Sequence, residues 1–218
     1  MKIQVLRNVF ARNDALAEQT RQMLDREGVV GFNLIGSAGA GKTTVLEAVL
    51  PTLSDSARVA VLEGDIATTR DAERIAKIGV DVMQLTTEGG CHLSAAQVHE
   101  AVKRLDLSGL DAVFVENVGN LVCPASFDIG EHVRVAVLSF AEGDDKPAKY
   151  PLLFKTAHLV VLTKSDLSAM CDFDPGRAEA FIRTVNRDVP VMVVSARTGE
   201  NMQQLAEWFG ERVSHLDR

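Results

Sequence analysis

The phosphate-loop motif at residues 36–43 constrains the fold of this chain more than any other feature, because it reads Gly-Ser-Ala-Gly-Ala-Gly-Lys-Thr. It matches G-x-x-x-x-G-K-[ST], in which glycine lets successive backbone N–H groups wrap closely around an anion. The motif requires a buried strand before it and a helix after it, and the chain offers an apolar run at 29–35 and a helical pattern at 44–53. These flanks favour a nucleotide-binding loop over the alternative, a glycine-rich structural turn.

The motif also assigns roles to individual side chains. We expect Lys42 to reach the β- and γ-phosphates and to act in catalysis, and the Thr43 hydroxyl to ligate Mg²⁺. The residues expected to hold the nucleotide phosphates are Gly36, Ser37, Ala38, Gly39, Ala40, Gly41, Lys42, Thr43 and Thr44.

Composition excludes several classes of protein. The 218 residues are 46% hydrophobic and carry a net charge of −7, which disfavours a general nucleic-acid binder. No apolar run approaches the roughly 18 residues that span a bilayer, and the first eight residues lack the pattern of a signal peptide. We therefore expect a cytoplasmic protein with neither nucleic acid nor membrane as a partner. Its three cysteines make a disulfide framework an unfavoured interpretation.

Strand and helix patterns alternate along the chain, which predicts an α/β fold: a P-loop NTPase with a mostly parallel sheet of about seven strands flanked by helices. We expect one domain over 1–218, with a leading helical segment at 1–28 whose helix covers 6–27. The further strands are predicted at 58–63, 80–85, 111–117, 132–140, 158–163 and 190–195. The further helices are predicted at 69–78, 95–105, 176–187 and 200–215. The polar stretch 141–149 is expected to be an exposed connection.

Acidic residues follow two of the predicted strands. Asp65 ends the second strand and Glu116 ends the fourth, and ligands of such sheets lie at the carboxyl ends of strands. We expect both to be catalytic and to hold Mg²⁺, with Asp65 orienting the attacking water. Gly119 is expected to offer its N–H to the γ-phosphate. Each acid alone is also compatible with a solvated loop, and only the order after the phosphate loop favours the functional interpretation.

The segment Thr163-Lys164-Ser165-Asp166 indicates which base is bound. A carboxylate at Asp166 can accept hydrogen bonds from guanine N1–H and the exocyclic amine, a pair of donors that adenine lacks. The Lys164 stem can cover the base, and a backbone N–H at Ser195 or Ala196 can meet guanine O6. We therefore expect GTP, with Thr163, Lys164, Asp166, Ser195 and Ala196 in its base pocket. A helix N-cap turn at Asp166 is the structural alternative.

A second group of residues has the chemistry of a transition-metal site. Cys91 and His92 precede a helix whose start carries a capping box, Ser94 and Gln97. Cys123 lies four residues beyond Gly119, after another strand. Thiolate and imidazole ligands suit Zn²⁺ or Ni²⁺, although small buried cysteines are common and spacing alone leaves both interpretations open.

Three ligands fall short of a closed tetrahedral site, so water, an acid or a second subunit must complete it. His99 is expected to be structural, and Cys171 shows no partner.

With these residues assembled, the chain resembles the HypB family of GTPases, which help insert nickel into [NiFe]-hydrogenases. The segments that carry the resemblance are the phosphate loop, 63–68, 89–93, 116–124 and 142–151. The resemblance implies a single P-loop GTPase domain, slow GTP hydrolysis, GTP-promoted homodimerisation, and nickel or zinc at Cys91, His92 and Cys123. It also implies a hydrogenase precursor and a partner nickel chaperone as partners.

Two departures from the family pattern stand out. Thr163 replaces the usual asparagine of the guanine motif, and residues 1–30 contain neither cysteine nor histidine, so an additional N-terminal nickel site is not expected. The alternatives are a related metal-insertion GTPase for urease or a cobalamin enzyme, a metal-independent GTPase switch, and a small-molecule kinase. The related UreG proteins have Cys-Pro-His where this chain has Cys91-His92, which favours HypB.

Overall fold

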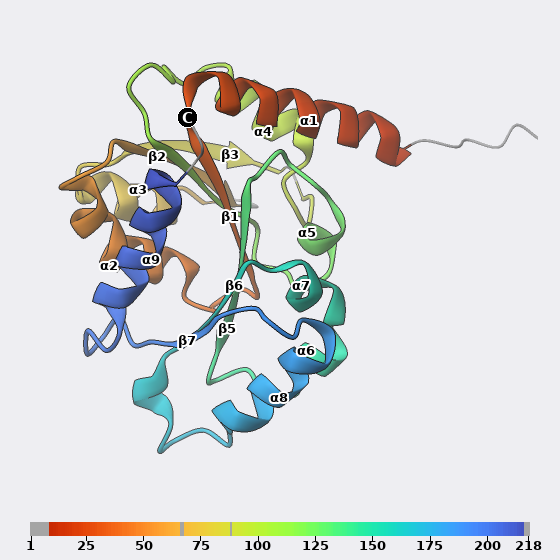
Figure 1. Cartoon of the computed structure of the whole chain (residues 1–218), viewed down its shortest axis with the longest axis vertical. Coiled ribbons are helices and arrows are strands. Elements are labelled where there is room, and N and C mark those ends of the chain that lie inside the picture. Colours follow the sequence, from red (N-terminus) through yellow and green to blue (C-terminus); the bar gives the residue numbers. More distant parts are fainter. Residues whose placement is uncertain (1–8, 66–67, 88, 216–218) are drawn as a thin grey trace, which may run out of the picture.

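The seven predicted strands form one sheet in the computed structural model, which describes residues 9–65, 68–87 and 89–215 (Figure 1). The strands are β1 Val30–Gly36, β2 Val59–Asp65, β3 Asp81–Thr86, β4 Ala112–Glu116, β5 Val133–Ser139, β6 Leu159–Thr163 and β7 Val191–Val193. Their order is β3-β2-β4-β1-β5-β6-β7, and each neighbouring pair runs parallel. The prediction of a parallel α/β sheet is therefore confirmed.

Helices cover both faces of this sheet, as parallel strands require. The helices are α1 Val9–Glu27, α2 Lys42–Ser54, α3 Arg70–Lys77, α4 Ala95–Val102, α5 Cys123–Ser126, α6 Lys146–Lys149, α7 Pro151–Thr156, α8 Pro175–Val185 and α9 Met202–Ser214. One face packs against α2, α3 and α9, on the left in Figure 1. The other packs against α1 and α4 at one end of the sheet and α7 and α8 at the other.

The central strand β1 determines where the phosphate loop lies. It pairs with β4 on one side and β5 on the other, and all seven of its residues are buried. Its side chains alternate between the two cores: Phe32 stacks on Phe114 with ring centroids 4.6 Å apart, whereas Ile35 enters the opposite core. The phosphate loop thus leaves the middle of the sheet at the edge where all parallel strands end.

The leading helix is observed as α1, which begins at Val9; the earlier part of the expected helix lies outside the described residues. It packs along α4, where Thr20 Oγ1 lies 3.1 Å from His99 Nδ1, the residue expected to be structural. Arg21 joins α1 to the loop before β5 through Asp128 at 2.8 Å. The predicted capping box of Ser94 and Gln97 opens α4.

Among the described residues, no helix combines the length and apolar character needed to cross a bilayer.

The expectation of an exposed connection at 141–149 is met at Ala141, Ala148 and Lys149 but is wrong at Asp144 and Pro147. Asp144 is only 5% exposed, Pro147 is buried, and the stretch contains α6. The cause is a partner distant in sequence: Asp144 Oδ2 accepts hydrogen bonds from the backbone N–H of Asp174 at 2.9 Å and from Arg177 Nε at 2.9 Å. This carboxylate therefore joins the segment after β5 to the start of α8.

We predict that Asp144→Asn destabilises the fold by about 1–3 kcal/mol at pH 7, because Arg177 loses its charged partner. The neighbouring Arg177 guanidinium lowers the pKa of Asp144. A lowered folded-state pKa means that the carboxylate stabilises the fold above about pH 4, and that this contribution disappears as the pH falls further. Urea unfolding should therefore show the deficit at pH 7 and a smaller one near pH 3.5.

Asp145→Asn is the matched control, since the Asp145 side chain is about half exposed and forms its ion pair with Lys149 on the surface. An equal loss of stability in both variants at pH 7 would contradict a special role for the buried carboxylate.

Candidate functional site

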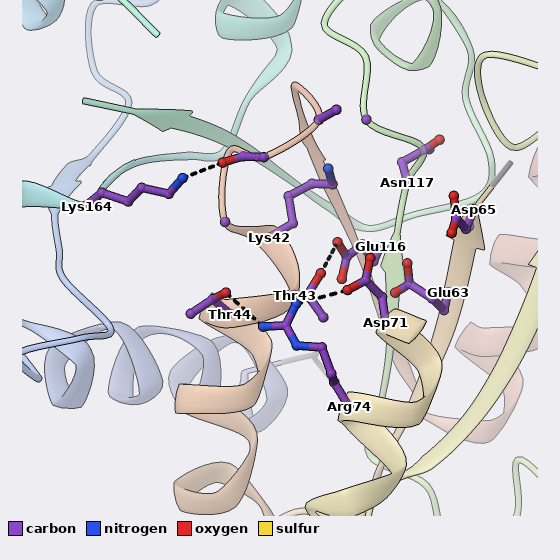
Figure 2. Close-up of a pocket in the computed structure, with 15 residues that line it drawn as sticks. Lys42, Thr43, Thr44, Glu63, Asp65, Asp71, Arg74, Glu116, Asn117 and Lys164 are labelled. Atoms are coloured by element: carbon purple, nitrogen blue, oxygen red, sulfur yellow. Dashed lines mark hydrogen bonds and ion pairs between the residues drawn. The ribbon is translucent and has the colours of Figure 1, made fainter. Parts of the chain in front are cut away.

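A cavity of about 340 Å³ lies over the start of α2, at the carboxyl edge of the sheet (Figure 2). It receives side chains from the phosphate loop, the ends of β2 and β4, the first turns of α3, and Lys164 after β6. Each of the three residues expected to be catalytic, Lys42, Asp65 and Glu116, borders this one cavity. Gly119, expected at the γ-phosphate, borders it as well.

The phosphate loop has the backbone conformation that its glycines permit. Gly39 and Gly41 have φ values of 77° and 94°, a backbone region that residues other than glycine rarely adopt. The turn ends at Gly41, and α2 starts at Lys42, so the unpaired N–H groups of the first helical turn face the cavity. The Lys42 ammonium is buried and lies 3.3 Å from the carbonyl oxygens of Gly36 and Ser37.

Two buried carboxyl groups lie side by side beneath this loop. Glu63 and Glu116 are paired in register across β2 and β4, and Glu116 Oε1 accepts a hydrogen bond from the Thr43 hydroxyl at 2.8 Å. Burial, reinforced by the Glu116 charge, raises the pKa of Glu63 to about 10. Burial also raises the pKa of Glu116, opposed by the positive charge of Lys42.

This donor set fits a hard cation. Within the described part of the chain, the second carboxylate oxygen of Glu116 is buried and makes no hydrogen bond. It lies beside the Thr43 hydroxyl, and oxygen ligands of this kind are the ones that Mg²⁺ prefers. Asp65 ends β2 at the same cavity, and its Oδ2 accepts hydrogen bonds from the N–H and the hydroxyl of Thr68 at 3.2 and 2.5 Å.

Sequence reasoning missed five residues that border this cavity, of which Gly64 has no side chain and four are polar: Glu63, Asp71, Arg74 and Asn117. Arg74 is the most connected of them, because its guanidinium donates to Thr44 at 3.0 Å and to Asp71 at 2.9 Å (Figure 2), and also to Glu47. Nothing in the sequence shows which face of α3 meets α2. Glu63 had a usable signal, because it directly follows the apolar run 59–62 of its strand, just as Glu116 follows the apolar run of β4, and the two residues pair in register.

A second cavity of about 290 Å³ continues from the first, and both are bordered by Gly41, Thr44 and Lys164. Thr163, Lys164, Asp166 and Ala196, all expected near the base, line it. Ser195 lies behind it: its hydroxyl donates to Asp166 Oδ1 at 2.6 Å, and its N–H is already bonded to the Glu200 carbonyl at 3.1 Å. Of the two expected backbone contacts, Ala196 is therefore the one that faces this cavity.

Thr163 has a definite role in place of the usual asparagine. Its hydroxyl donates to the Ala40 carbonyl of the phosphate loop at 2.6 Å, and the Lys164 ammonium donates to the Gly39 carbonyl at 2.6 Å. Lys164 adopts a left-handed conformation with φ of 61°, which directs its side chain back over the loop. The turn after β6 is thus bonded to the phosphate loop at two points.

Cys91, His92 and Cys123 come together although 32 residues separate the two cysteines in sequence. Their three ligand atoms all lie within 4.8 Å of one another, and Cys91 Sγ lies 3.7 Å from His92 Nδ1. The His92 ring stacks on Phe127 with centroids 4.2 Å apart. Burial lowers the pKa of His92, which favours the neutral form that binds metals, and the adjacent Cys91 raises the pKa of Cys123. Cys171 lies elsewhere, against the core beside α8.

The two regions are close along the chain as well as in space. Gly119 sits directly against the phosphate loop, because a Cβ built on it would be 2.6 Å from Ala38 Cα and 2.7 Å from Ala38 N. Only glycine fits this approach. Cys123, the first residue of α5, follows four residues later.

Comparison with known proteins places these features in a family. The family described as CobW/HypB/UreG, nucleotide-binding domain, matches residues 31–193. The hydrogenase maturation factor HypB of Rhizobium leguminosarum bv. viciae is 44% identical over 207 residues, covering 95% of this chain and 69% of that protein. The probable hydrogenase maturation factor HypB of Methanocaldococcus jannaschii is 37% identical over 214 residues, covering 98% and 97%.

Solved structures agree with the sequence relatives. HypB from Archaeoglobus fulgidus superposes with a TM-score of 0.87 at 30% identity, covering 93% of this chain and 99% of that one. HypB from Helicobacter pylori, solved in complex with nickel, gives a TM-score of 0.88 at 33% identity, covering 93% and 95%. With three quarters of its length inside the family domain, this chain belongs to the CobW/HypB/UreG family and, within it, to the HypB hydrogenase maturation factors.

Proposed function

We propose that this protein is a GTP-hydrolysing metallochaperone that helps insert nickel into a [NiFe]-hydrogenase precursor. The observation that carries the proposal is the Cys91, His92 and Cys123 cluster, whose third member lies four residues from the glycine that packs on the phosphate loop. Nickel is cargo in this scheme, and the nucleotide controls when it is held and when it is released.

The cavity over α2 supplies the groups that GTP hydrolysis needs. Lys42 turns its ammonium from the loop carbonyls to the β- and γ-phosphates, where it balances charge on the transferring group. Thr43, Glu116 and Asp65 would hold Mg²⁺, which when bound would neutralise phosphate charge. Asp65 orients the water that attacks the γ-phosphorus, giving GDP and phosphate. Gly119 brings its backbone N–H to the γ-phosphate.

The second cavity selects guanine. Asp166 is held by the Ser195 hydroxyl at 2.6 Å, so its carboxylate is already oriented to accept from N1–H and the exocyclic amine. The apolar stem of Lys164 covers one face of the base, and the backbone at Ala196 faces its edge. Adenine presents an acceptor at N1 instead of a donor, so the same carboxylate repels it.

The thiolate and imidazole ligands suit Ni²⁺ and Zn²⁺. Support for nickel comes from the family and from the nickel-bound HypB of Helicobacter pylori. Three ligands leave one tetrahedral position, and a second copy of the chain is the partner we propose to complete it when GTP is bound. The dimer then delivers nickel to the precursor, directly or through a partner chaperone.

The γ-phosphate affects the metal through the chain between the two sites. A γ-phosphate bonded to the Gly119 N–H draws the segment 119–123 toward itself and moves Cys123 relative to Cys91. Metal affinity then differs between the GTP and GDP states, and by linkage the metal alters nucleotide affinity by the same factor. Loss of phosphate relaxes the segment and releases nickel.

We predict that Asp166→Ala weakens GDP binding by about 100-fold or more, because two charge-assisted hydrogen bonds are lost. The weak binding of ADP should change little, so the preference for guanine falls sharply. Isothermal titration with both nucleotides measures this. Asp172→Ala, an exposed acid outside both cavities, is the control and should bind GDP as the wild type does. If Asp166→Ala still prefers GDP over ADP as the wild type does, the second cavity is not the site that recognises guanine.

We predict that Cys123→Ser weakens nickel binding by more than the roughly 10- to 100-fold that the loss of an outer-shell partner costs. Cys91→Ala should do the same and also abolish the effect of nucleotide on the metal, with GTP binding intact. Nickel and zinc titrations in GDP and in a non-hydrolysable GTP analogue, with association state recorded in parallel, test this. Cys171→Ser is the matched control. If the wild-type protein binds nickel with equal affinity and contains an equal fraction of monomer in GDP and in the GTP analogue, the chaperone proposal is overturned.

A further inference from the structure

Glu116, the last residue of β4, and Asn117, the residue that follows it, direct their side chains to opposite faces of the sheet. Glu116 points toward Thr43 and the nucleotide cavity, whereas the Asn117 side chain points away from that carboxylate (Figure 2). Alternation along a strand requires this, and Asn117 continues the ladder because its N–H donates to the Leu34 carbonyl at 3.0 Å. The face that receives Asn117 also carries Asn33 of β1 and the segment that contains Cys91 and His92.

Asn117 is 1% exposed, and its side-chain amide makes three hydrogen bonds, none of them to the phosphate loop. Its Oδ1 accepts from the backbone N–H of Leu93 at 3.1 Å and from that of Val118 at 3.0 Å. Its Nδ2 donates to Asn33 Oδ1 at 3.2 Å. Because both partners of the oxygen are backbone donors, the orientation of the amide is fixed by the hydrogen bonds themselves.

The bond to Leu93 N–H acts on His92, because the peptide between them is planar. Six atoms, from His92 Cα to Leu93 Cα, move as one unit, so holding the Leu93 nitrogen also holds the His92 backbone. The Leu93 side chain is fully buried and lies against Gly64, where a Cβ would be only 2.7 Å from Leu93 Cδ1. His92 cannot shift as a rigid body unless the bond to Asn117 shifts or breaks.

The bond to Val118 N–H acts on the other side. It locks the Asn117 side chain to the backbone that leads into Gly119, which lies against Ala38 of the phosphate loop. Any movement of the Val118–Gly119 backbone toward that loop therefore rotates the Asn117 amide with it. The single oxygen of Asn117 thus joins the nucleotide side of the sheet to the His92 peptide on the opposite side.

We propose that Asn117 is a positioning residue that transmits the state of the nucleotide to His92. This rests on the proposed nucleotide-controlled metal binding, and it adds a second connection to the one through 119–123, which reaches only Cys123. With both connections, the third phosphate repositions two ligands that come from different loops, so the geometry of the whole cluster changes rather than that of one thiolate.

The test compares nickel dissociation constants at saturating GDP·Mg²⁺ and at a saturating non-hydrolysable GTP analogue with Mg²⁺. Saturation removes any change in nucleotide affinity from the ratio of the two constants. We expect a ratio that departs from one by about fivefold or more in the wild type, and by less than about twofold in Asn117→Ala. Asn33→Ala is the matched control, since it disturbs the same buried network but leaves the Asn117–Leu93 bond, and its ratio should match the wild type.

The outcomes separate this inference from the function on which it rests. If the two nickel dissociation constants of the wild type are equal, the proposal of nucleotide-controlled metal binding is wrong, and so is the role of Asn117 that rests on it. If nucleotide changes nickel affinity equally in the wild type and in Asn117→Ala, only the proposed role of Asn117 is overturned. Loss of coupling in both Asn117→Ala and Asn33→Ala would show that loosening the buried network is sufficient, which also overturns it.

A measurement on the wild type decides the case if Asn117→Ala does not fold. In metal-free protein, the NMR signals of the Leu93 amide and the Asn117 side-chain amide should move between GDP and the GTP analogue. The amide of Ile182, buried in α8 away from both sites, should stay in place. Unchanged Leu93 and Asn117 signals in the two nucleotides would overturn the proposal.

Discussion

The parallel register of β1, β2 and β4 is the constraint on which both sites depend. Leu34, Glu63 and Glu116 occupy matching positions on these three adjacent strands, so the turns that follow them leave the sheet at one level. A shift of β4 by one residue would exchange the faces of Glu116 and Asn117 and leave neither site with its side chain. The extensive burial of β1 and β4, with Phe32 stacked on Phe114, opposes such a shift.

The segment that carries Cys91 and His92 is attached to nucleotide-side elements at both of its ends. At one end, Thr87 N–H donates to the Asp65 carbonyl at 3.2 Å; at the other, Leu93 N–H donates to Asn117 at 3.1 Å. Between them, Gly89 has a φ of 94° and Thr87 holds the Gly90 carbonyl at 2.8 Å. Cys91 and His92 therefore lie on a short segment attached to the ends of β2 and β4, the two strands that also carry the acids of the nucleotide cavity.

Sequence patterns were sufficient to locate the features that are determined by residues close together in the sequence. Buried apolar runs located all seven strands, the glycine motif located the phosphate loop, and ligand chemistry at two strand ends selected Cys91, His92 and Cys123. Patterns failed where the cause lies far along the chain. Asp144 looked like a solvated acid because its partner Arg177 is 33 residues away, and helices of four to six residues, such as α5 and α7, are too short to show a helical period.

The two bonds from the turn after β6 to the phosphate loop, Thr163 to Ala40 and Lys164 to Gly39, join protein groups directly. They preorganise the phosphate loop, because the entropy of fixing this loop against the turn that carries Asp166 is lost when the chain folds and not when a nucleotide binds. More of the intrinsic interaction energy between nucleotide and protein is then free to appear as affinity.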